Sequence, residues 1–166
     1  MKVLSVVAPH DFQDKEYGDS RAALELAGHK VYVVSTEFEV QGKYGLDIIA
    51  DFILGDIQID EFDAVMFIGG AGCEDYFDYD PALNLAKDFY NSGKITAAIC
   101  AAPVILANAG ILEGKKSTCW QGSVETIKEK GADYTGSPVE QDGLIITADG
   151  PGSATAFGRK IAENLG

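Results

Sequence analysis

One segment constrains the fold of this chain more than any other, namely Lys94 to Gly110 with Cys100 at its centre. Apolar and β-compatible residues run directly into Cys100, small residues follow, and a helix-compatible apolar segment starts at Pro103. The pattern predicts a strand, a sharp turn and a helix, with Cys100 at the turn. Such a turn directs a nucleophile toward the N–H groups of the next helix, so we expect a reactive thiol with a lowered pKa. The alternative is that Cys100 is a small buried residue ending a core strand.

The rest of the chain alternates strand-like and helix-like segments. Apolar runs predict buried strands at residues 2–8, 30–35, 63–68 and 143–147, and helical patterns cover residues 15–27, 80–93, 123–130 and 150–165. We expect Asp80 to cap the second of these helices, with Pro81 at its first position. Gln41-Gly42-Lys43, within residues 38–49, predicts a hairpin. The alternation predicts a doubly wound α/β sheet in one domain, residues 1–166.

In a sheet of this kind the ligand crevice lies beyond the carboxyl ends of the strands. The segments that follow those ends are residues 9–16, 69–74, 100–103 and 150–153, and we expect them to converge. His10 lies in the first of them, where it acts either as a base or as a solvated surface residue. Cys73 and Cys119 either surround the same crevice as Cys100, where Cys119 could resolve an oxidised Cys100, or serve as packing residues. Trp120 forms either a partly exposed rim of the pocket or ordinary core.

Charge and cysteine content limit the possible partners. The chain carries 26 acidic against 13 basic side chains, a net charge of −13, which repels nucleic acid and anionic lipid surfaces. No apolar run is long enough to span a bilayer, and the first one is too short for a signal peptide. Three cysteines and two histidines without ligand spacing predict a reducing cytoplasm, no disulfide framework and no metal site.

A family resemblance rests on the order and spacing of several short segments. They are Gln13-Asp14-Lys15-Glu16, Glu61-Phe62-Asp63-Ala64, Gly69-Gly70, Ala97-Ala98-Ile99-Cys100-Ala101, Asp142-Gly143-Leu144-Ile145-Ile146-Thr147 and Gly150-Pro151-Gly152. With the apolar first strand, these segments resemble the ThiJ/PfpI superfamily, including its deglycase and PfpI intracellular protease branches. The resemblance implies a flavodoxin-like, mostly parallel sheet with helices on both faces, related to class I glutamine amidotransferases. It also implies a homodimer or larger assembly.

The same resemblance implies roles for individual residues, without a cofactor. Cys100 is the nucleophile, and Glu16 is the glutamate that hydrogen-bonds its sulfur; a raised pKa at Glu16 would accompany a lowered one at Cys100. The backbone of Gly69, Gly70 and Ala101 would form an oxyanion hole. Residues implied at the pocket wall are Gly150 and Pro151, together with His10, Cys119 and Trp120, and Glu74 matches an acidic residue that the proteases place at a subunit interface.

Three positions depart from the family pattern. Ala101 stands where PfpI-type proteases carry histidine, so the general base of a Cys-His pair is missing. The histidine of deglycase-like members falls on Cys119 or Trp120, depending on a gap of one residue. Asp149 replaces an arginine before Gly150-Pro151-Gly152.

The leading functional hypothesis is therefore a cofactor-free cysteine enzyme acting on a small carbonyl substrate, of the glyoxalase or deglycase type, through Cys100 and Glu16. The alternative is a non-enzymatic redox or stress-responsive protein that senses oxidation at Cys100. A PfpI-type peptidase is a third hypothesis, which Ala101 disfavours because it cannot act as a base.

Overall fold

The computed structural model describes every residue from Met1 to Gly166, and a seven-stranded sheet forms its centre. In spatial order the strands are β11 (Val139–Asp142), β12 (Ile145–Ala148), β8 (Ile95–Ile99), β7 (Ala64–Phe67), β1 (Lys2–Val6), β3 (Lys30–Ser35) and β6 (Phe52–Ile53). Neighbouring strands are parallel, except that β11 and β12 are antiparallel. The predicted α/β fold with a mostly parallel sheet is confirmed.

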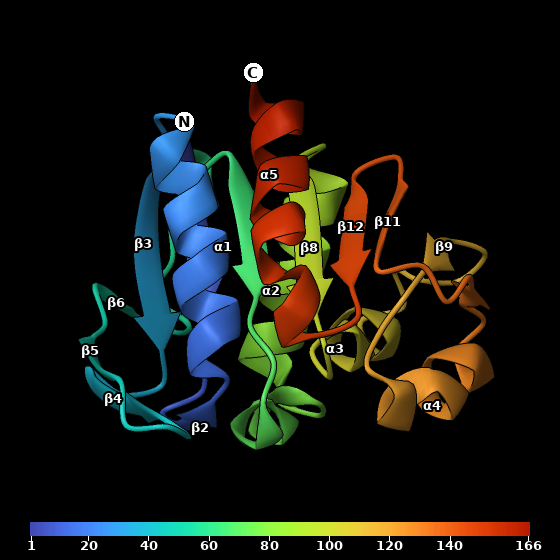
Figure 1. Cartoon of the computed structure of the whole chain (residues 1–166), viewed down its shortest axis with the longest axis horizontal. Helices are drawn as coiled ribbons and strands as arrows, with labels where there is room; N and C mark the ends of the chain where they lie inside the picture. Colours follow the sequence, from blue (N-terminus) through green and yellow to red (C-terminus); the bar gives the residue numbers. More distant parts are fainter.

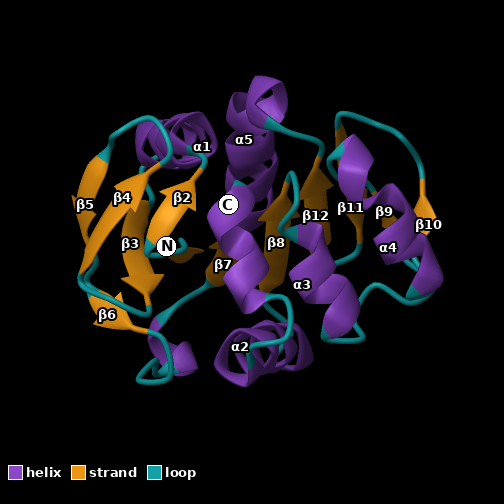
Figure 2. Ribbon diagram, turned by 90° about the horizontal axis from the view of Figure 1, so that it is seen from below, coloured by secondary structure: helices purple, strands orange, loops and turns teal.

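Helices cover both faces of this sheet (Figures 1 and 2). Helices α1 (Asp14–Leu26) and α5 (Ala154–Leu165) lie on one face, and α2 (Asp80–Asn91) and α3 (Pro103–Asn108) lie on the other, with α4 (Val124–Glu129) beside α3. Successive residues of a strand therefore enter different cores: Val65 packs on the α2 side and Met66 on the α1 side. Burial on both faces explains why the central strands read as unbroken apolar runs.

The long helices bury one stripe each. In α5 the buried residues Phe157, Ile161 and Leu165 follow at intervals of four, which places them on one face. Gly158 lets α5 approach α1 closely, since an added Cβ there would lie 2.5 Å from the Ser20 carbonyl oxygen and 2.9 Å from the Ala23 Cβ.

Two small sheets and four 3₁₀ turns complete the fold. One sheet contains β2 (His10–Phe12), β4 (Glu39–Gly42) and β5 (Asp47–Ile49), and the other pairs β9 (Lys116–Ser117) with β10 (Asp133–Tyr134). The turns are η1 (Ile59–Glu61), η2 (Ala71–Tyr76), η3 (Gln121–Ser123) and η4 (Pro151–Ser153). The hairpin prediction is confirmed by the antiparallel β4–β5 pair, whereas β2, β9, β10 and β11 were not predicted because they are short and partly polar.

Two local predictions need correction. The N-cap of α2 is Tyr79, with an extended backbone at φ −93°, and Asp80 is the first helical residue. Its carboxylate still lies in the first turn, where the helix dipole stabilises it. The hairpin turn, predicted at Gln41-Gly42-Lys43, begins later, because β4 extends through Gly42. The turn is fixed by Asp14, whose carboxylate accepts the N–H groups of Tyr44 at 3.0 Å and Leu46 at 2.9 Å.

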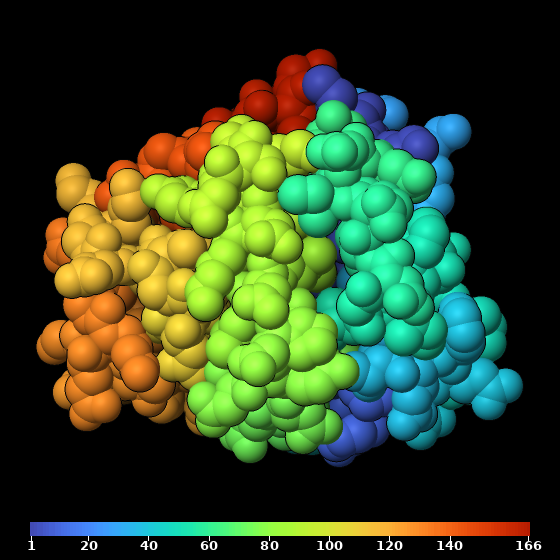
Figure 3. Space-filling view, turned by 180° about the vertical axis from the view of Figure 1, so that it is seen from behind, coloured from blue at the N-terminus to red at the C-terminus, as the bar shows by residue number.

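The carboxyl ends of the parallel strands gather at the lower edge of the sheet in Figure 1, with β2, η2 and α4 around them, and both chain termini lie at the opposite edge. Viewed from behind in Figure 3, the segment around residues 50–60 lies next to α2. No helix has the length and apolar character needed to cross a membrane.

Candidate active site at Cys100

Cys100 occupies the sharp turn that its sequence context predicts. Its φ is +64°, and Asp11 is the only other non-glycine residue with positive φ. The Cys100 N–H donates to the Ala148 carbonyl at 2.9 Å, and its own carbonyl accepts the Trp120 N–H at 2.7 Å. Because a left-handed backbone at a residue with a Cβ costs free energy, the neighbouring strands must hold it in place. The structure thus confirms a strand, a turn and a helix around Cys100.

Glu16 lies directly beside this turn. It sits in the first turn of α1, whose N–H groups at Lys15 and Glu16 are capped by the side-chain oxygen of Gln13. The Glu16 side chain is fully buried, and its Oε1 accepts the Gly69 N–H at 3.0 Å. Its Oε2 has no partner of conventional hydrogen-bond geometry, and the remaining polar group that interacts with the carboxyl is the Cys100 thiol.

Gly69 and Gly70 allow Cys100 and Glu16 to lie close together. An added Cβ at Gly69 would lie 2.7 Å from both the Cys100 Cβ and the Glu16 Oε1, so only glycine fits between them. Gly70 has φ +104°, and an added Cβ there would lie 2.6 Å from the backbone nitrogen of Gln13. The backbone N–H groups of Gly70 and Ala101 lie near enough to the Cys100 thiol to oppose the rise in its pKa. Two convergent backbone donors at a nucleophile form the kind of cradle that stabilises an oxyanion or thiolate.

The ionisation of the pair differs in part from expectation. Burial raises the pKa of Glu16 to about 7, as predicted. Burial and the adjacent Glu16 carboxylate also raise the pKa of Cys100 to about 12, against the opposing effect of the Ala101 and Gly70 N–H groups. The prediction of a lowered thiol pKa is therefore wrong beside an ionised Glu16. The pair releases one proton near neutrality and holds the second, as coupled sites do.

The other two cysteines lie near this turn but are buried: the Cys73 N–H donates to the Gly70 carbonyl at 3.2 Å, and Cys119 precedes Trp120, whose backbone N–H donates to the Cys100 carbonyl. All three thiols are free. Cys73 and Cys119 are buried in the core on the α2 side, whereas Cys100 packs against the core on the α1 side. Burial raises the pKa of Cys119 to about 12 and raises the pKa of Cys73 as well. These positions support the packing interpretation of Cys73 and Cys119.

Two of the predicted wall segments reach the elbow through the backbone. The backbone N–H of Trp120, a residue exposed to 52%, donates the hydrogen bond to the Cys100 carbonyl described above. Gly150 and Pro151 follow β12 after Asp149, and the last residue of β12, Ala148, accepts the Cys100 N–H. Asp149 at the start of that loop accepts the Ser153 hydroxyl at 2.6 Å, so its carboxylate is used within the loop.

His10 is engaged away from Cys100. It is exposed on β2, with Nε2 2.9 Å from the Asp75 carboxylate and Nδ1 3.3 Å from that of Asp11. These two acidic neighbours raise the pKa of His10. Glu74 is exposed on η2. The capping role of Gln13 and the pairing of Asp75 with His10 were not predicted; a polar residue just before a helical pattern was the available signal for Gln13.

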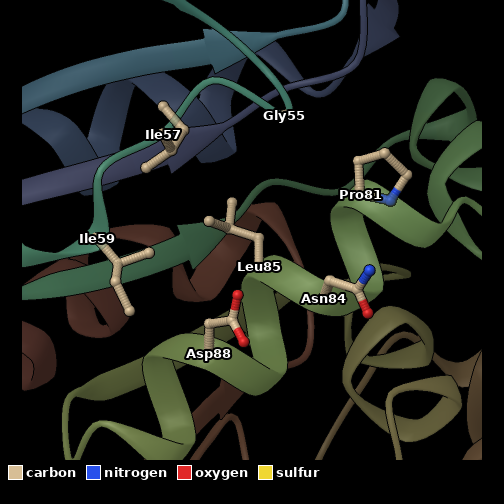
Figure 4. A pocket seen from close by; sticks show the side chains of 7 residues that line it. All are labelled: Gly55, Ile57, Ile59, Pro81, Asn84, Leu85 and Asp88. Carbon is tan, nitrogen blue, oxygen red and sulfur yellow. The ribbon is translucent and has the colours of Figure 1, made fainter.

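The open hollows of the surface lie apart from this constellation. The hollow drawn in Figure 4 encloses about 270 Å³ between the 55–59 segment and α2. Its lining residues are Gly55, Ile57, Ile59, Pro81, Asn84, Leu85 and Asp88. Neither Cys100 nor Glu16 lines it. No group of three His, Cys, Asp or Glu side chains is arranged to hold a metal ion.

The fold and the strained turn together define an α/β protein with a cysteine at a strand–turn–helix elbow. A family model described as DJ-1/PfpI matches residues 1–164, and the chain belongs to this family. An uncharacterized protein of Methanocaldococcus jannaschii is 40% identical, over 99% of this chain and 82% of that protein. The Deglycase PfpI of Pyrococcus furiosus is 32% identical over 99% of both chains.

A solved structure gives the same result in three dimensions. The ThiJ/PfpI domain protein from Brachyspira murdochii superposes with a TM-score of 0.97 at 36% identity, covering 99% of this chain and 95% of that one. The membership of the ThiJ/PfpI superfamily expected from the sequence is confirmed.

Proposed function

We propose that this protein is a cysteine-dependent, cofactor-free enzyme that acts on small carbonyl compounds, of the glyoxalase or deglycase type. The observation that carries the proposal is the close approach of Cys100 and a fully buried Glu16 around Gly69; the Glu16 pKa of about 7 suits proton transfer near neutrality. Relatives named deglycases, among them the one from Pyrococcus furiosus, add support.

For a 2-oxoaldehyde the reaction balances with water as the only co-reactant. The Cys100 sulfur bonds to the aldehyde carbon, and the thiol proton passes through Glu16 to the carbonyl oxygen, which gives a hemithioacetal. The N–H groups of Gly70 and Ala101 stabilise the oxygen while it is negative. Glu16 then removes the proton from that carbon and returns a proton to the neighbouring ketone carbon, while the hydroxyl proton of the hemithioacetal moves to the ketone oxygen. The resulting thioester is hydrolysed to a 2-hydroxy acid, which frees Cys100; the aldehyde carbon is oxidised and the ketone carbon reduced.

The test is glutathione-free consumption of methylglyoxal by the wild-type protein and by Cys100→Ser. We expect turnover by the wild type and its loss in the variant, since the hydroxyl is a far weaker nucleophile than the thiol. Cys73→Ser is the matched control, because it makes the same change at a fully buried thiol in the other core. Equal activity in wild type and Cys100→Ser would refute the mechanism.

A second candidate function, reversible sensing of oxidants, is favoured by the difference in exposure among the thiols. Cys100 is partly exposed, whereas Cys73 and Cys119 are buried. Limiting hydrogen peroxide should convert the Cys100 thiol to a sulfenic acid with release of water. Intact mass and peptide mapping should locate the added oxygen on Cys100; equal labelling of the three cysteines would exclude this function. The peptidase hypothesis lacks support at this site, because Ala101 supplies no imidazole.

A further inference from the structure

Trp120 is a large apolar side chain exposed next to the reactive cysteine. The backbone N–H of Trp120 donates to the Cys100 carbonyl at 2.7 Å, and 52% of the residue is exposed. The other large apolar residues that are exposed to a comparable degree are at the N-terminus, in α1 or around the β4–β5 hairpin. They are Met1, Leu26, Phe38, Tyr44 and Ile49. None of the hydrogen bonds that fix the mouth of the site requires an indole, so the exposed ring is unexplained by the fold.

The local backbone holds this indole in one place. Its six-membered ring lies over Gly122, where an added Cβ would overlap the ring atoms. The Trp120 carbonyl accepts the Ser123 N–H at 2.9 Å, which closes the η3 turn beneath the ring. Gly122 does not have the positive φ that would itself demand glycine. The space that Gly122 leaves is therefore filled by the indole, and a ring fixed before binding loses little entropy when a ligand stacks on it.

We propose that Trp120 is a specificity-determining residue that favours 2-oxoaldehydes carrying a planar aromatic substituent. The inference rests on the proposed function and names its substrate class. The substituent of such a substrate is attached one carbon from the atom that Cys100 attacks, and Trp120 is the large exposed apolar residue whose backbone hydrogen-bonds that cysteine. Aromatic rings attract one another at centroid separations of about 4.5–7 Å, so stacking requires the substituent to come within this range of the indole.

The experiment compares kcat/KM for phenylglyoxal and methylglyoxal in the wild type, Trp120→Ala, Trp120→Phe and Gly122→Ala. Stacking of two rings corresponds to a factor of about two to ten, so Trp120→Ala should lower the phenylglyoxal to methylglyoxal ratio by that factor. Trp120→Phe should retain most of the ratio, and Gly122→Ala should reduce it by displacing the ring. Phe38→Ala is the matched control, because Phe38 is exposed to 55% near the hairpin.

The inference is overturned if Trp120→Ala leaves the ratio of kcat/KM for phenylglyoxal to methylglyoxal unchanged. An equal fall of kcat/KM with both aldehydes is such a result and marks a structural role for Trp120. A second measurement needs no turnover: the rates at which N-phenyl iodoacetamide and iodoacetamide alkylate Cys100 in the same variants. If the wild type turns over neither aldehyde, the proposed function fails. The alkylation ratio then decides alone whether Trp120 selects aromatic reagents, and a ratio insensitive to Trp120→Ala refutes it.

Discussion

The Glu16→Gln substitution tests the buried carboxyl through its effect on stability. Glutamine has nearly the same shape and still offers an oxygen to the Gly69 N–H, but it cannot ionise. The wild-type carboxyl has a pKa of about 7 in the folded protein against 4.5 in the reference state. The folded state therefore binds more protons than the unfolded state between these values. Wild-type stability consequently falls as pH rises through this window, whereas the contribution of the substituted amide stays constant.

The magnitude follows from the shift. A displacement from 4.5 to about 7 corresponds to about 3 kcal/mol over the full window. Between about pH 5.5 and about pH 8.5, which avoids the region of low net charge, about 2 kcal/mol of this remains. Glu16 is fully buried, so solvent screening does not reduce the effect substantially.

The assay is urea unfolding of the wild type and Glu16→Gln under reducing conditions at several pH values. The difference between the two free energies of unfolding removes the contributions of the titrating groups that Glu16 does not perturb; the Cys100 thiol, which it does perturb, adds little below about pH 8.5 because its unfolded pKa lies near 9. We expect the variant to gain about 2 kcal/mol relative to the wild type from the lower to the higher pH. A difference that is independent of pH, or that moves in the opposite direction, would refute a raised pKa at Glu16.

Three further predictions concern residues outside this pair. Gly158→Ala should lower the free energy of unfolding by about 1–3 kcal/mol despite the better helix propensity of alanine, because the new methyl group would meet the Ser20 carbonyl. Chemical denaturation measures this free energy, and a gain in stability would contradict the prediction. Asp14→Ala removes the acceptor of two N–H groups in the β4–β5 turn, so hydrogen exchange there should accelerate, and unchanged protection would disprove the tether. Asp75→Asn should lower the pKa of His10 in an NMR titration, because it removes one of the two carboxylates that raise it; an unchanged pKa would show that Asp75 has no influence.

Local patterns sufficed for the framework of this fold. The apolar runs identified β1, β3, β7, β8 and β12 because each strand is buried on both faces and its internal polar residues, Ser5, Thr96 and Thr147, are small. Strand β11 was not found, since its residues Val-Glu-Gln-Asp are only half-buried at the sheet edge. The spatial order of the strands depends on contacts between residues far apart in the sequence. The alternation of strands and helices therefore predicts the α/β class of the fold but not the strand order.

The candidate site also has one part that local sequence predicts and another that it does not. The turn at Cys100 could be predicted because strand, turn and helix are contiguous in sequence. Glu16 lies 84 positions earlier, and its sequence neighbourhood alone is that of an ordinary helix start. Only the family resemblance singled it out, and the raised pKa of Cys100 could not be predicted because it depends on burial and on the charge of that distant partner.

The absence of a nearby imidazole determines which pH dependence the proposed enzyme must have. His10 is held by Asp75, and His29 is buried at the start of β3, so Glu16 is the group at Cys100 with a pKa near neutrality. Below about pH 7 the pair holds both protons; above it, the pair has lost one, and either the thiolate with neutral Glu16 or the thiol with ionised Glu16 can start the reaction.

The value of kcat/KM should therefore rise with pH through about 7 and remain level until the second proton leaves near pH 12. A descending limb between these values would reveal another essential acid and would contradict Glu16 as the single proton shuttle. The same ionisation that activates the site places a charge in the core, so activity should increase over the pH range in which stability decreases. A carboxyl retained there at such a cost is expected for a group that reacts, whereas a purely structural position would be satisfied by glutamine.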